Sequence, residues 1–560
     1  MSALREALAA LEARSGLGAL GRALLGRRLA GGARWTRALG AALLGLLLLQ
    51  LASGVGLALH YAPTTTSAWA SVDHLERAVP GGELVRALHA WGASFLVALA
   101  GLHLVGAGAS AAYRRPRELS WALGLLLLPL LLAFGLTGYL LPWDQRGYWA
   151  TTVALGIARA TPLVGESAAR VLQGGPELSS LTLTRFYALH ALVLPGGLLA
   201  LLALHLRANA RAHAALLAEG APGAPWWPGQ ALRDLLLLAV ALLGVVGLAL
   251  ALGAALEAPA DPGSDFPPRP EWWFMPLREL LKVVPEPWGS VVLPGLLGCA
   301  WLLLPWLDPP TRPRPRLRAA LVLIPALGYL LLGLRAVLLD RADPEYALAR
   351  ARADEDAALA RELARQGVPP EGAGALLEHH PPRRGERLFQ LHCQECHPLR
   401  GEGGQEGPDL TGYLSREWLM DVIRAPRDPR FFGHTALDGM DPLPRAEWEQ
   451  LPALAAFLES QQSPAQAARL DPALVAKGEE AYLELECFAC HPIDPGEEGE
   501  APNLHGYGSE EWLAAFLKDP GSARFYGEMN DMPGYAEDLS AEDIAALVTF
   551  LRGLKDEGRR

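Results

Sequence analysis

The sequence predicts an all-α protein in which seven transmembrane helices precede two small helical domains. Three observations lead to this fold class. The 560-residue chain is 51% hydrophobic and 19% charged, against about 25% charged residues in an average soluble domain. Residues 1–340 hold 27 basic and 19 acidic side chains, whereas residues 341–560 hold 22 and 41. The acidic second part also contains the string Cys-x-x-Cys-His twice.

Composition excludes several classes of protein. The net charge of −11 excludes a polybasic nucleic-acid-binding protein, and the long apolar runs exclude a disordered chain. Five cysteines are too few for a disulfide framework in so long a chain. Four of them, Cys393, Cys396, Cys487 and Cys490, form the two Cys-x-x-Cys-His strings, a pattern typical of covalent haem c attachment. The fifth, Cys299, is interpreted as a packing residue.

Seven stretches are apolar and long enough to cross about 30 Å of hydrocarbon, if some of them tilt. They are residues 36–60, 84–107, 120–141, 184–207, 233–255, 290–307 and 318–339. Residues 1–35 carry scattered arginines and no small-residue cleavage site, so we expect a cytoplasmic N-terminal segment and no signal peptide.

Basic residues give the orientation. They gather in the N-terminal segment and in the loops after the second, fourth and sixth spans, for example Arg22, Arg114, Arg207 and Arg312. The positive-inside rule makes this side cytoplasmic. We therefore expect a multi-pass protein of the bacterial inner membrane, embedded in lipid, with its acidic C-terminal part on the outer side, where haem c is attached.

Two spans each carry a pair of histidines, His89 with His103 and His190 with His205. Spacings of 14 and 15 residues return to nearly the same helix face after a rise of roughly 21–22 Å. Two such helices facing each other can hold two stacked haems, with one histidine from each helix per haem. The alternative, hydrogen-bonded structural histidines, explains one such residue more easily than two matched pairs.

Glycines recur in register with these histidines. Gly40 and Gly54 in the first span, and Gly124 and Gly138 in the third, are again 14 residues apart. A flat macrocycle packed against a helix requires a missing side chain at the contact. Ordinary small-residue helix packing is the alternative, and beside the histidine pairs we favour the haem interpretation.

Residues 36–213 resemble cytochrome b of the Rieske/cytochrome b quinol-oxidising complexes, in a four-helix dihaem domain. The matching strings are QLASG at 50–54, RALH at 86–89, PRE at 116–118, GYLLPWDQ at 138–145 and TLTR at 182–185. Residues 226–340 resemble the C-terminal, three-helix part of the same protein through PEWWF at 270–274.

This resemblance implies ligands and quinone sites. His89 and His190 would hold the outer haem b, and His103 and His205 the inner one, with Arg86 and Arg185 among the cofactor-binding residues. Quinol would be oxidised near the outer haem. That site would be lined by Pro270, Glu271 and Trp272 and by Pro162 and Gly165, with Glu271 as the proton acceptor. Asp234 matches an acid at the second quinone site, although an exposed helix-starting aspartate explains it almost as well.

Two positions depart from the family pattern. Position 106 is glycine where the family usually has arginine, so Arg114 or Arg207 would have to serve the inner haem propionates. Chloroplast-type relatives attach an extra haem through a cysteine near the position of Ala38, and we expect no such haem here.

The C-terminal part contains an internal repeat. Residues 341–383 are charged and helix-prone, and we interpret them as a connector. A period of 94 then relates Cys393 to Cys487 and Trp418 to Trp512, which predicts two similar domains at 384–462 and 472–556.

Each copy resembles a class I cytochrome c. The two cysteines would bind the haem covalently, and His397 or His491 would bind its iron. We expect the sixth ligand later in the same copy: Met440, with His434 as an alternative, in the first, and Met532, with Met529 as an alternative, in the second. Methionine ligation would raise the potential. Zinc binding or thiol redox chemistry is the alternative for these motifs.

The predicted function is that of a quinol–cytochrome c oxidoreductase subunit with two b and two c haems. Electrons from quinol would divide between a Rieske and haem c route and a transmembrane haem b route, coupled to proton translocation. The expected partners are a separate Rieske iron–sulfur protein, a soluble or membrane cytochrome or terminal oxidase, and a second copy of the chain. The alternative is a haem conduit that passes electrons between partner enzymes without dividing them.

Overall fold

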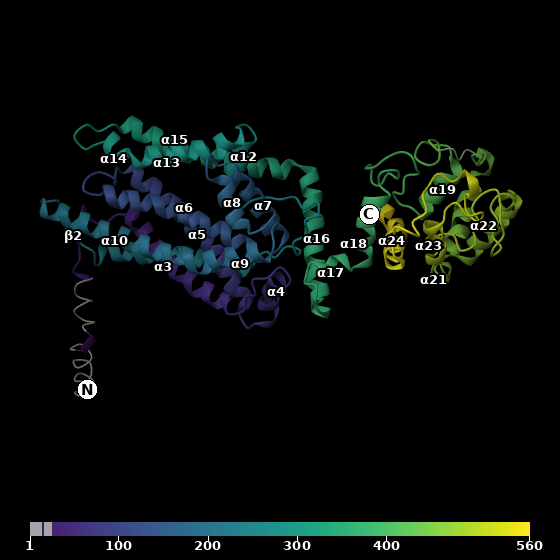
Figure 1. The fold of residues 1–560 in the computed structure, drawn as a ribbon, viewed down its shortest axis with the longest axis horizontal. Coiled ribbons are helices and arrows are strands. Elements are labelled where there is room, and N and C mark those ends of the chain that lie inside the picture. The colour runs from purple at the N-terminus through teal and green to yellow at the C-terminus, as the bar shows by residue number, and fades with distance from the viewer. Residues whose placement is uncertain (1–13, 16–24, 436, 438, 560) are drawn as a thin grey trace. The chain divides into compact units, whose positions relative to one another are not determined.

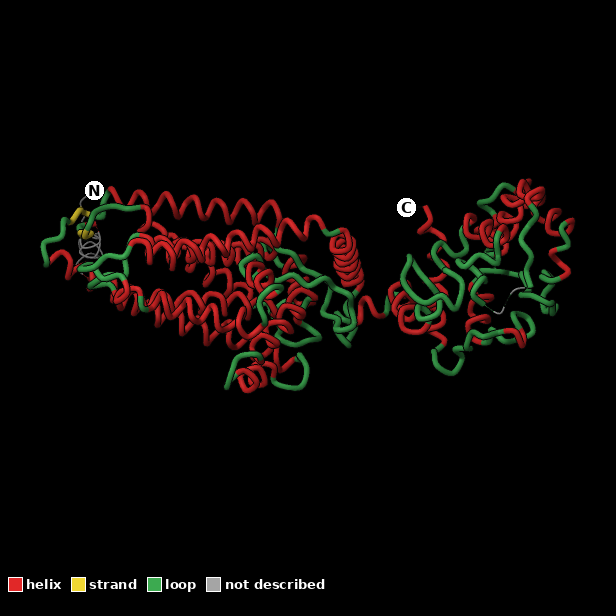
Figure 2. Tube along the Cα trace, turned by 90° about the horizontal axis from the view of Figure 1, so that it is seen from above, coloured by secondary structure: helices red, strands yellow, loops and turns green. Residues whose placement is uncertain are grey.

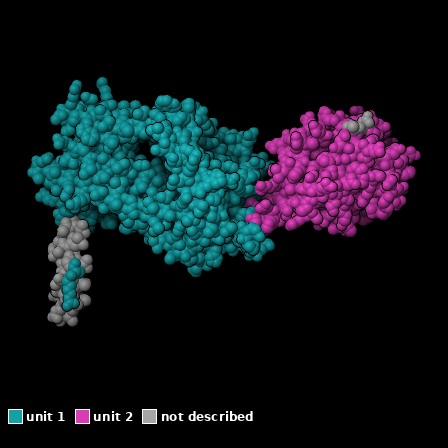
Figure 3. All heavy atoms as spheres, viewed as in Figure 1, with its two compact units in different colours: residues 1–374 teal, residues 375–560 magenta. Residues whose placement is uncertain are grey.

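The computed structural model describes residues 14–15, 25–435, 437 and 439–559. Arg22, one of the predicted cytoplasmic arginines, lies outside these residues. The chain forms two compact units, residues 1–374 and 375–560 (Figure 3). Both are helical, and the strands described are the short pair β1 (Arg28–Ala30) and β2 (Gly223–Pro225). The predicted all-α class is therefore confirmed.

Long apolar helices dominate the first unit and run roughly parallel to one another (Figures 1 and 2). Within the described residues, six are long and apolar enough to cross a membrane. They are α3 (Trp35–Ala58), α5 (Gly82–Ala109), α6 (Glu118–Leu140), the continuous stretch Ser180–Ala218, α11 (Gly229–Leu252) and α15 (Pro315–Ala342). The stretch Ser180–Ala218 consists of α9 (Ser180–Ala188), the π-helical turn η1 (Leu189–Val193) and α10 (Leu194–Ala218).

The predicted span at 290–307 is a shorter apolar helix, Pro287–Leu302, so the count of seven spans stays a prediction. It consists of η2 (Pro287–Val292) and α13 (Leu293–Leu302) and is followed by α14 (Leu304–Leu307). Leucines such as Leu235, Leu243 and Leu250 on α11 are more than half exposed, which is the surface that a helix presents to lipid.

Shorter helices cover one end of these spans. They are α4 (Ala68–Ala78), α7 (Gln145–Arg159), α8 (Gly165–Gln173) and α12 (Met275–Leu281). After α15 the chain turns at Asp343, whose side chain accepts hydrogen bonds from the first turn of α16 (Pro344–Gln366). Segment 341–383, predicted as a connector, therefore contains a 23-residue helix.

At the other end, β1 pairs antiparallel with β2, with Leu29 opposite Ala224. This pairing joins the segment before the first span to the loop before the fifth. Both lie on the side that the arginine distribution predicts to be cytoplasmic.

The second unit contains both copies of the repeat in one compact body. The first copy provides α17 (Ala375–Glu378), α18 (Pro381–His392), α19 (Arg416–Arg424), η3 (Arg445–Gln450), α20 (Leu451–Gln461) and α21 (Pro464–Ala467). The second provides α22 (Pro472–Glu484), η4 (Cys487–Ala489), α23 (Glu510–Lys518), η5 (Gly527–Met529), α24 (Ala541–Gly553) and η6 (Leu554–Arg559).

The terminal helices of the two copies pair across the repeat. The first helix of copy one, α18, packs on the last helix of copy two, α24, and α20 packs on α22. The domain boundaries 384–462 and 472–556 stay a prediction, and the packing crosses them.

Candidate haem and quinone sites

The four membrane histidines lie on two helical stretches of the first unit. His89 and His103 are on α5, and His190 and His205 are on the stretch Ser180–Ala218. The ring centroids of His89 and His190 are 6.2 Å apart with the planes at 70°. A metal–imidazole nitrogen bond is about 2 Å long, so this separation suits one iron between the two rings. His103 lies close enough to His205 for the two rings to interact electrostatically.

A π-helical turn explains the unequal spacing of the two pairs. His190 lies in η1, where the backbone accommodates one extra residue in the helix. The 15 residues from His190 to His205 therefore match the 14 from His89 to His103, which lie on a continuous α-helix. Sequence reasoning missed this turn, although π-turns often mark functional sites.

Each predicted glycine faces the ring of one of these histidines. A Cβ atom built on Gly138 would lie 2.6 Å from the His190 ring, and one on Gly54 would lie 3.2 Å from His89. The corresponding distances are 3.2 Å from Gly124 to His205 and 3.6 Å from Gly40 to His103. Glycine permits this close approach of the backbone.

Neighbouring groups orient three of the four rings through Nδ1. The Ser53 hydroxyl is 3.0 Å from Nδ1 of His89, and the Thr137 hydroxyl is 3.1 Å from Nδ1 of His190. Nδ1 of His205 lies 2.9 Å from the Ser120 carbonyl oxygen. With Nδ1 engaged, Nε2 is left for a metal, which is the usual arrangement of a ligating histidine. These residues therefore fit a haem.

A cluster of cations lies at the end of the unit that holds His103 and His205. Arg37 and Arg117 are close enough to repel each other electrostatically, and His213 lies near both. Among the described residues, Arg117 Nε and His213 Nδ1 are buried without a hydrogen-bond partner. Arg37 lies three residues before Gly40, which packs against His103. Arg117 lies three residues before Ser120, whose carbonyl oxygen contacts His205.

The two arginines suggested in place of Gly106 are arranged differently. Arg114 donates to both the side chain and the carbonyl of Asp308, at 2.6 and 2.9 Å, and Arg207 is exposed. The cluster around Arg117 therefore fits the haem propionates better than either.

A cavity of about 300 Å³ lies beside α6, near the His89 and His190 pair. Its lining includes Tyr139, Arg146, Pro270, Glu271, Tyr346 and Arg350. Tyr139 directly follows Gly138, which packs against His190, and Trp273 of the PEWWF string packs against Gly135. The Glu271 loop is therefore held one helical turn from the predicted outer haem.

The charge of Glu271 is controlled by its surroundings. Burial raises the pKa of its carboxyl group, while the nearby Arg146 and Tyr139 act in the opposite direction. Sequence reasoning identified Glu271 and missed Tyr139 and Arg146, although Tyr139 lies inside the quoted string 138–145 and Arg146 follows it.

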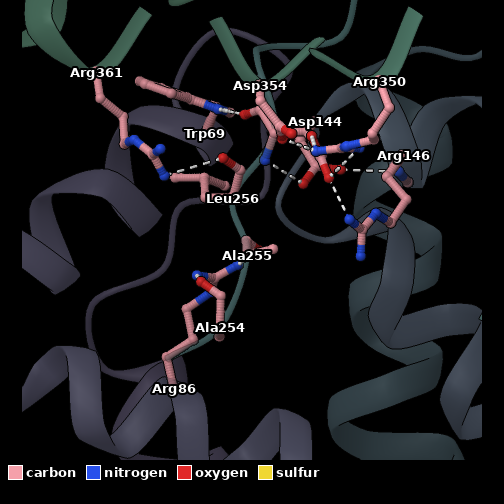
Figure 4. A network of polar contacts seen from close by, with 12 residues as sticks. Trp69, Arg86, Asp144, Arg146, Ala254, Ala255, Leu256, Arg350, Asp354 and Arg361 are labelled. Atoms are coloured by element: carbon pink, nitrogen blue, oxygen red, sulfur yellow. Dashed lines mark hydrogen bonds and ion pairs between the residues drawn. The ribbon is translucent and has the colours of Figure 1, made fainter. Parts of the chain in front are cut away.

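A buried ion-pair network joins two residues of the cavity lining, Arg146 and Arg350 of α16 (Figure 4). Glu257, 2% exposed, is paired with Arg146 and accepts two hydrogen bonds from Arg350, at 3.0 and 2.8 Å. Asp144 caps α7 through Gly147, and burial raises the pKa of its carboxyl group. Arg269 lies over the Tyr346 ring at 4.0 Å. The predicted connector thus contributes two side chains to the cavity, which no sequence motif indicated.

Other predicted residues lie outside this cavity. Trp272 is 44% exposed, Pro162 is in the loop between α7 and α8, and Gly165 is the first residue of α8; none of the three is among the lining residues. Arg86 pairs with Glu76 and donates to the Ala255 carbonyl at 2.7 Å, and Arg185 donates to the Val171 carbonyl. Asp234 accepts hydrogen bonds from Trp226 and Gln230, at 2.8 and 2.7 Å.

The two Cys-x-x-Cys-His motifs have matching geometry in the second unit. Nδ1 of His397 lies 2.9 Å from the Pro408 carbonyl oxygen, and Nδ1 of His491 is equally far from that of Pro502. Burial lowers the pKa of both imidazoles, which favours the neutral form that binds a metal. A Cβ atom on Gly407 would lie 2.8 Å from His397 Nδ1. Both motifs therefore fit a haem c with Nε2 toward the iron.

The candidate sixth ligands differ in exposure. Met440 and Met532 are partly buried, whereas Met529 is 55% exposed and His434 is exposed. Met532 packs against a core that also contains Cys393 and Tyr535.

Comparisons with known proteins agree with this arrangement. Four family models match parts of the chain: Cytochrome b/b6/petB at residues 32–211, Cytochrome b(C-terminal)/b6/petD at 265–340, Cytochrome c at 382–462 and Cytochrome C oxidase, cbb3-type, subunit III at 473–551.

Individual relatives match a smaller part of the chain. Cytochrome b6 of Cyanidium caldarium is 44% identical over 148 residues, which is 26% of this chain and 69% of that protein. Cytochrome b6 of Synechocystis is 41% identical over 167 residues, 30% of this chain and 75% of that protein. A solved structure described as a hyperthermophilic respiratory Complex III is similar with a TM-score of 0.50 and 26% identity, covering 61% of this chain and 92% of that one. The chain belongs to the cytochrome b/b6 family, with both parts of that protein and two cytochrome c domains on one polypeptide.

Proposed function

We propose that the chain is the cytochrome b and c subunit of a quinol-oxidising membrane complex of the complex III type. One observation carries this proposal: the partly buried Glu271 lines a cavity that α6 connects to the His89 and His190 pair. The similarity to cytochrome b6 proteins and to a respiratory Complex III supports it.

We assign four haems to this chain. The pairs His89 with His190 and His103 with His205 would each hold a haem b, and Arg37 and Arg117 would face the propionates of the second. The two Cys-x-x-Cys-His motifs would each bind a haem c. When bound, the haems supply one-electron acceptors and donors. The protein fixes their ligands, and the glycines of α3 and α6 leave room for the macrocycles.

The cavity residues handle the substrate and its protons. A quinol releases two protons as it loses two electrons, so a base must stand beside its hydroxyl group. The Glu271 carboxylate can accept one proton at an Oε atom. Arg146 and Tyr139 favour the ionised form of this carboxylate. Tyr346 and Arg350 of α16 form part of the cavity wall.

The two electrons of each quinol are proposed to divide. One would pass to a Rieske iron–sulfur protein on a separate chain and then by haem c to a soluble cytochrome or terminal oxidase. The other would cross the membrane by haem b to a second quinone at the cytoplasmic side, where Asp234 is a candidate residue. Proton release outside would then contribute to a proton gradient. The assembly would be a homodimer in the bacterial inner membrane, with its c domains outside.

Replacing Glu271 by Gln tests the proposal. We expect quinol oxidation to slow on the order of 10²-fold, the lower end of the contribution of a positioned base, with unchanged haem spectra. Because the base acts in its ionised form and burial raises its pKa, wild-type activity should rise with pH through a midpoint above the usual carboxyl range. The Glu271→Gln variant should lack this rise.

The matched control is Glu286→Gln, which changes an exposed glutamate of the same region. It should retain wild-type activity and pH dependence. Equal rates in the two variants would contradict the role of Glu271.

A further inference from the structure

We infer that the two copies of the repeat complete each other's haem c site. The haem attached at Cys393 and Cys396 would take its sixth iron ligand from copy two, at Met532. The haem attached at Cys487 and Cys490 would take its own from copy one, at Met440. The inference rests on the haem c attachment proposed above and is independent of quinol oxidation.

Helix pairing is the first argument. In the described part of the second unit, α18 packs extensively on α24 and α20 on α22, whereas α18 with α20 and α22 with α24 make no comparable contact. A glycine lies at the contact between the helices in each of these two pairs. A Cβ atom on Gly385 of α18 would lie 2.6 Å from Phe550 Cβ of α24, and one on Gly478 of α22 would lie 2.8 Å from Phe457 Cβ of α20. Gly385 and Gly478 occupy nearly equivalent places in the repeat, so a glycine permits the close helix contact in both pairs.

The hydrophobic cores also combine residues of both copies. One core joins Leu454 and Phe457 of copy one to Ala481 and Tyr482 of copy two. Leu443 of copy one, three residues after Met440, packs against this core together with Cys487. The segment that carries Met440 therefore lies with the haem motif of the other copy.

The Met532 segment lies with the first haem motif. The hydroxyl of Tyr535, three residues after Met532, donates to the carbonyl of His392 at 2.9 Å. His392 directly precedes Cys393, and its ring lies 6.1 Å from that of Tyr535. Three residues of extended chain span about 10 Å, so Met532 is held near the motif of copy one and partly buried against its core.

An approximate two-fold relation between the copies explains the reciprocity. Tyr413 and Tyr507 are equivalent in the 94-residue repeat, and their side chains lie close enough to interact. The next equivalent pair is also in contact, since a Cβ atom on Gly508 would lie 2.7 Å from the Leu414 side chain. Contact between equivalent residues is the mark of a two-fold interface, here within one chain. Tyr413 lies shortly before α19, and Tyr507 lies shortly before α23.

The ligand assignment is tested in the full-length protein with one haem c motif removed. In a Cys487→Ala/Cys490→Ala background, only the haem at Cys393 and Cys396 is attached, which a covalent haem stain verifies. There, Met532→Ala should abolish the methionine–iron charge-transfer band and lower the midpoint potential of haem c. Met440→Ala and Met529→Ala should leave both unchanged. Loss of the band with Met440→Ala or Met529→Ala instead would overturn the assignment.

A haem-independent measurement covers the case in which these variants fail to fold. Arg384 and Asp543 form an ion pair at 2.8 Å. When both are replaced in a Cys299→Ala chain, as Arg384→Cys and Asp543→Cys, a short thiol cross-linker should join the two new thiols. The matched control pairs Arg384→Cys with Glu449→Cys, because Glu449 is the repeat equivalent of Asp543. Efficient cross-linking of the 384/449 pair and not the 384/543 pair would contradict the exchange.

Discussion

The membrane unit and the C-terminal unit support their predicted haem sites in different ways. In the membrane unit, each of two helical stretches carries two histidines at matched spacing, and glycines on neighbouring helices face them in register. In the C-terminal unit, each histidine is oriented within its own copy, while the helices around it come from both copies. Sites whose ligands recur at matched spacing along each of two helices can be found from the sequence, whereas a site built by exchange depends on tertiary packing.

Gly138→Leu should have the largest effect on the membrane unit. Its side chain would occupy the space of the His190 ring, which a Cβ atom alone already approaches to 2.6 Å. We expect loss of one of the two haem b signals and of quinol oxidation, measured by reduced-minus-oxidised spectra and turnover. The control Gly101→Ala, with nothing within 4 Å of an added Cβ, should retain both. A Gly138→Leu variant with full haem b content would refute the close packing.

Glu257→Gln should destabilise the membrane unit next most strongly. Glu257 is buried between Arg146 and Arg350, and removing its charge leaves both arginines without their shared partner. Breaking a buried pair costs about 3–5 kcal/mol. Thermal unfolding in detergent should show a lowered midpoint, and the exposed Glu286→Gln control should not. An unchanged midpoint would show that α16 is held in place by other contacts.

Arg117→Gln should have the smallest effect, confined to one haem. Removing a cation beside haem propionates disfavours the reduced form, because reduction removes positive charge from the iron. We expect a lowered midpoint potential for the inner haem b alone, measured by redox titration. Arg207→Gln, at an exposed position, is the comparison. A shift with Arg207→Gln and none with Arg117→Gln would transfer the role to Arg207.

Much of the membrane unit could be predicted because its chemistry follows helix periodicity. The spacing of His89 and His103 gave a common face, and the glycines 14 residues apart lie against the predicted rings. The π-turn at His190 could not be predicted, since it shows in the sequence only as one extra residue. The part of α16 in the cavity was missed for another reason: its charged residues indicate a solvated helix, and only folding brings Arg350 to Glu257.

The C-terminal unit shows what an internal repeat leaves undetermined. The period of 94 residues predicts two similar sets of elements, and the geometries at Pro408 and Pro502 are alike. The repeat does not determine whether α18 packs on α20 or on α24, because these two helices occupy equivalent places in it. Ten residues join α20 to α22, and their direct pairing leaves α18 to pack on α24. The short link thus accounts for the exchange in physical terms.

Oxidant-induced reduction of haem b tests the proposed function most directly. Membranes containing the protein are given quinol, reoxidation of haem b through the second quinone site is blocked, and a pulse of oxidant is added. Our account predicts that haem b becomes more reduced while haem c becomes oxidised, because each quinol sends its two electrons along different routes. If haem b and haem c become oxidised together, the electrons do not divide, and the chain acts as a simple haem conduit.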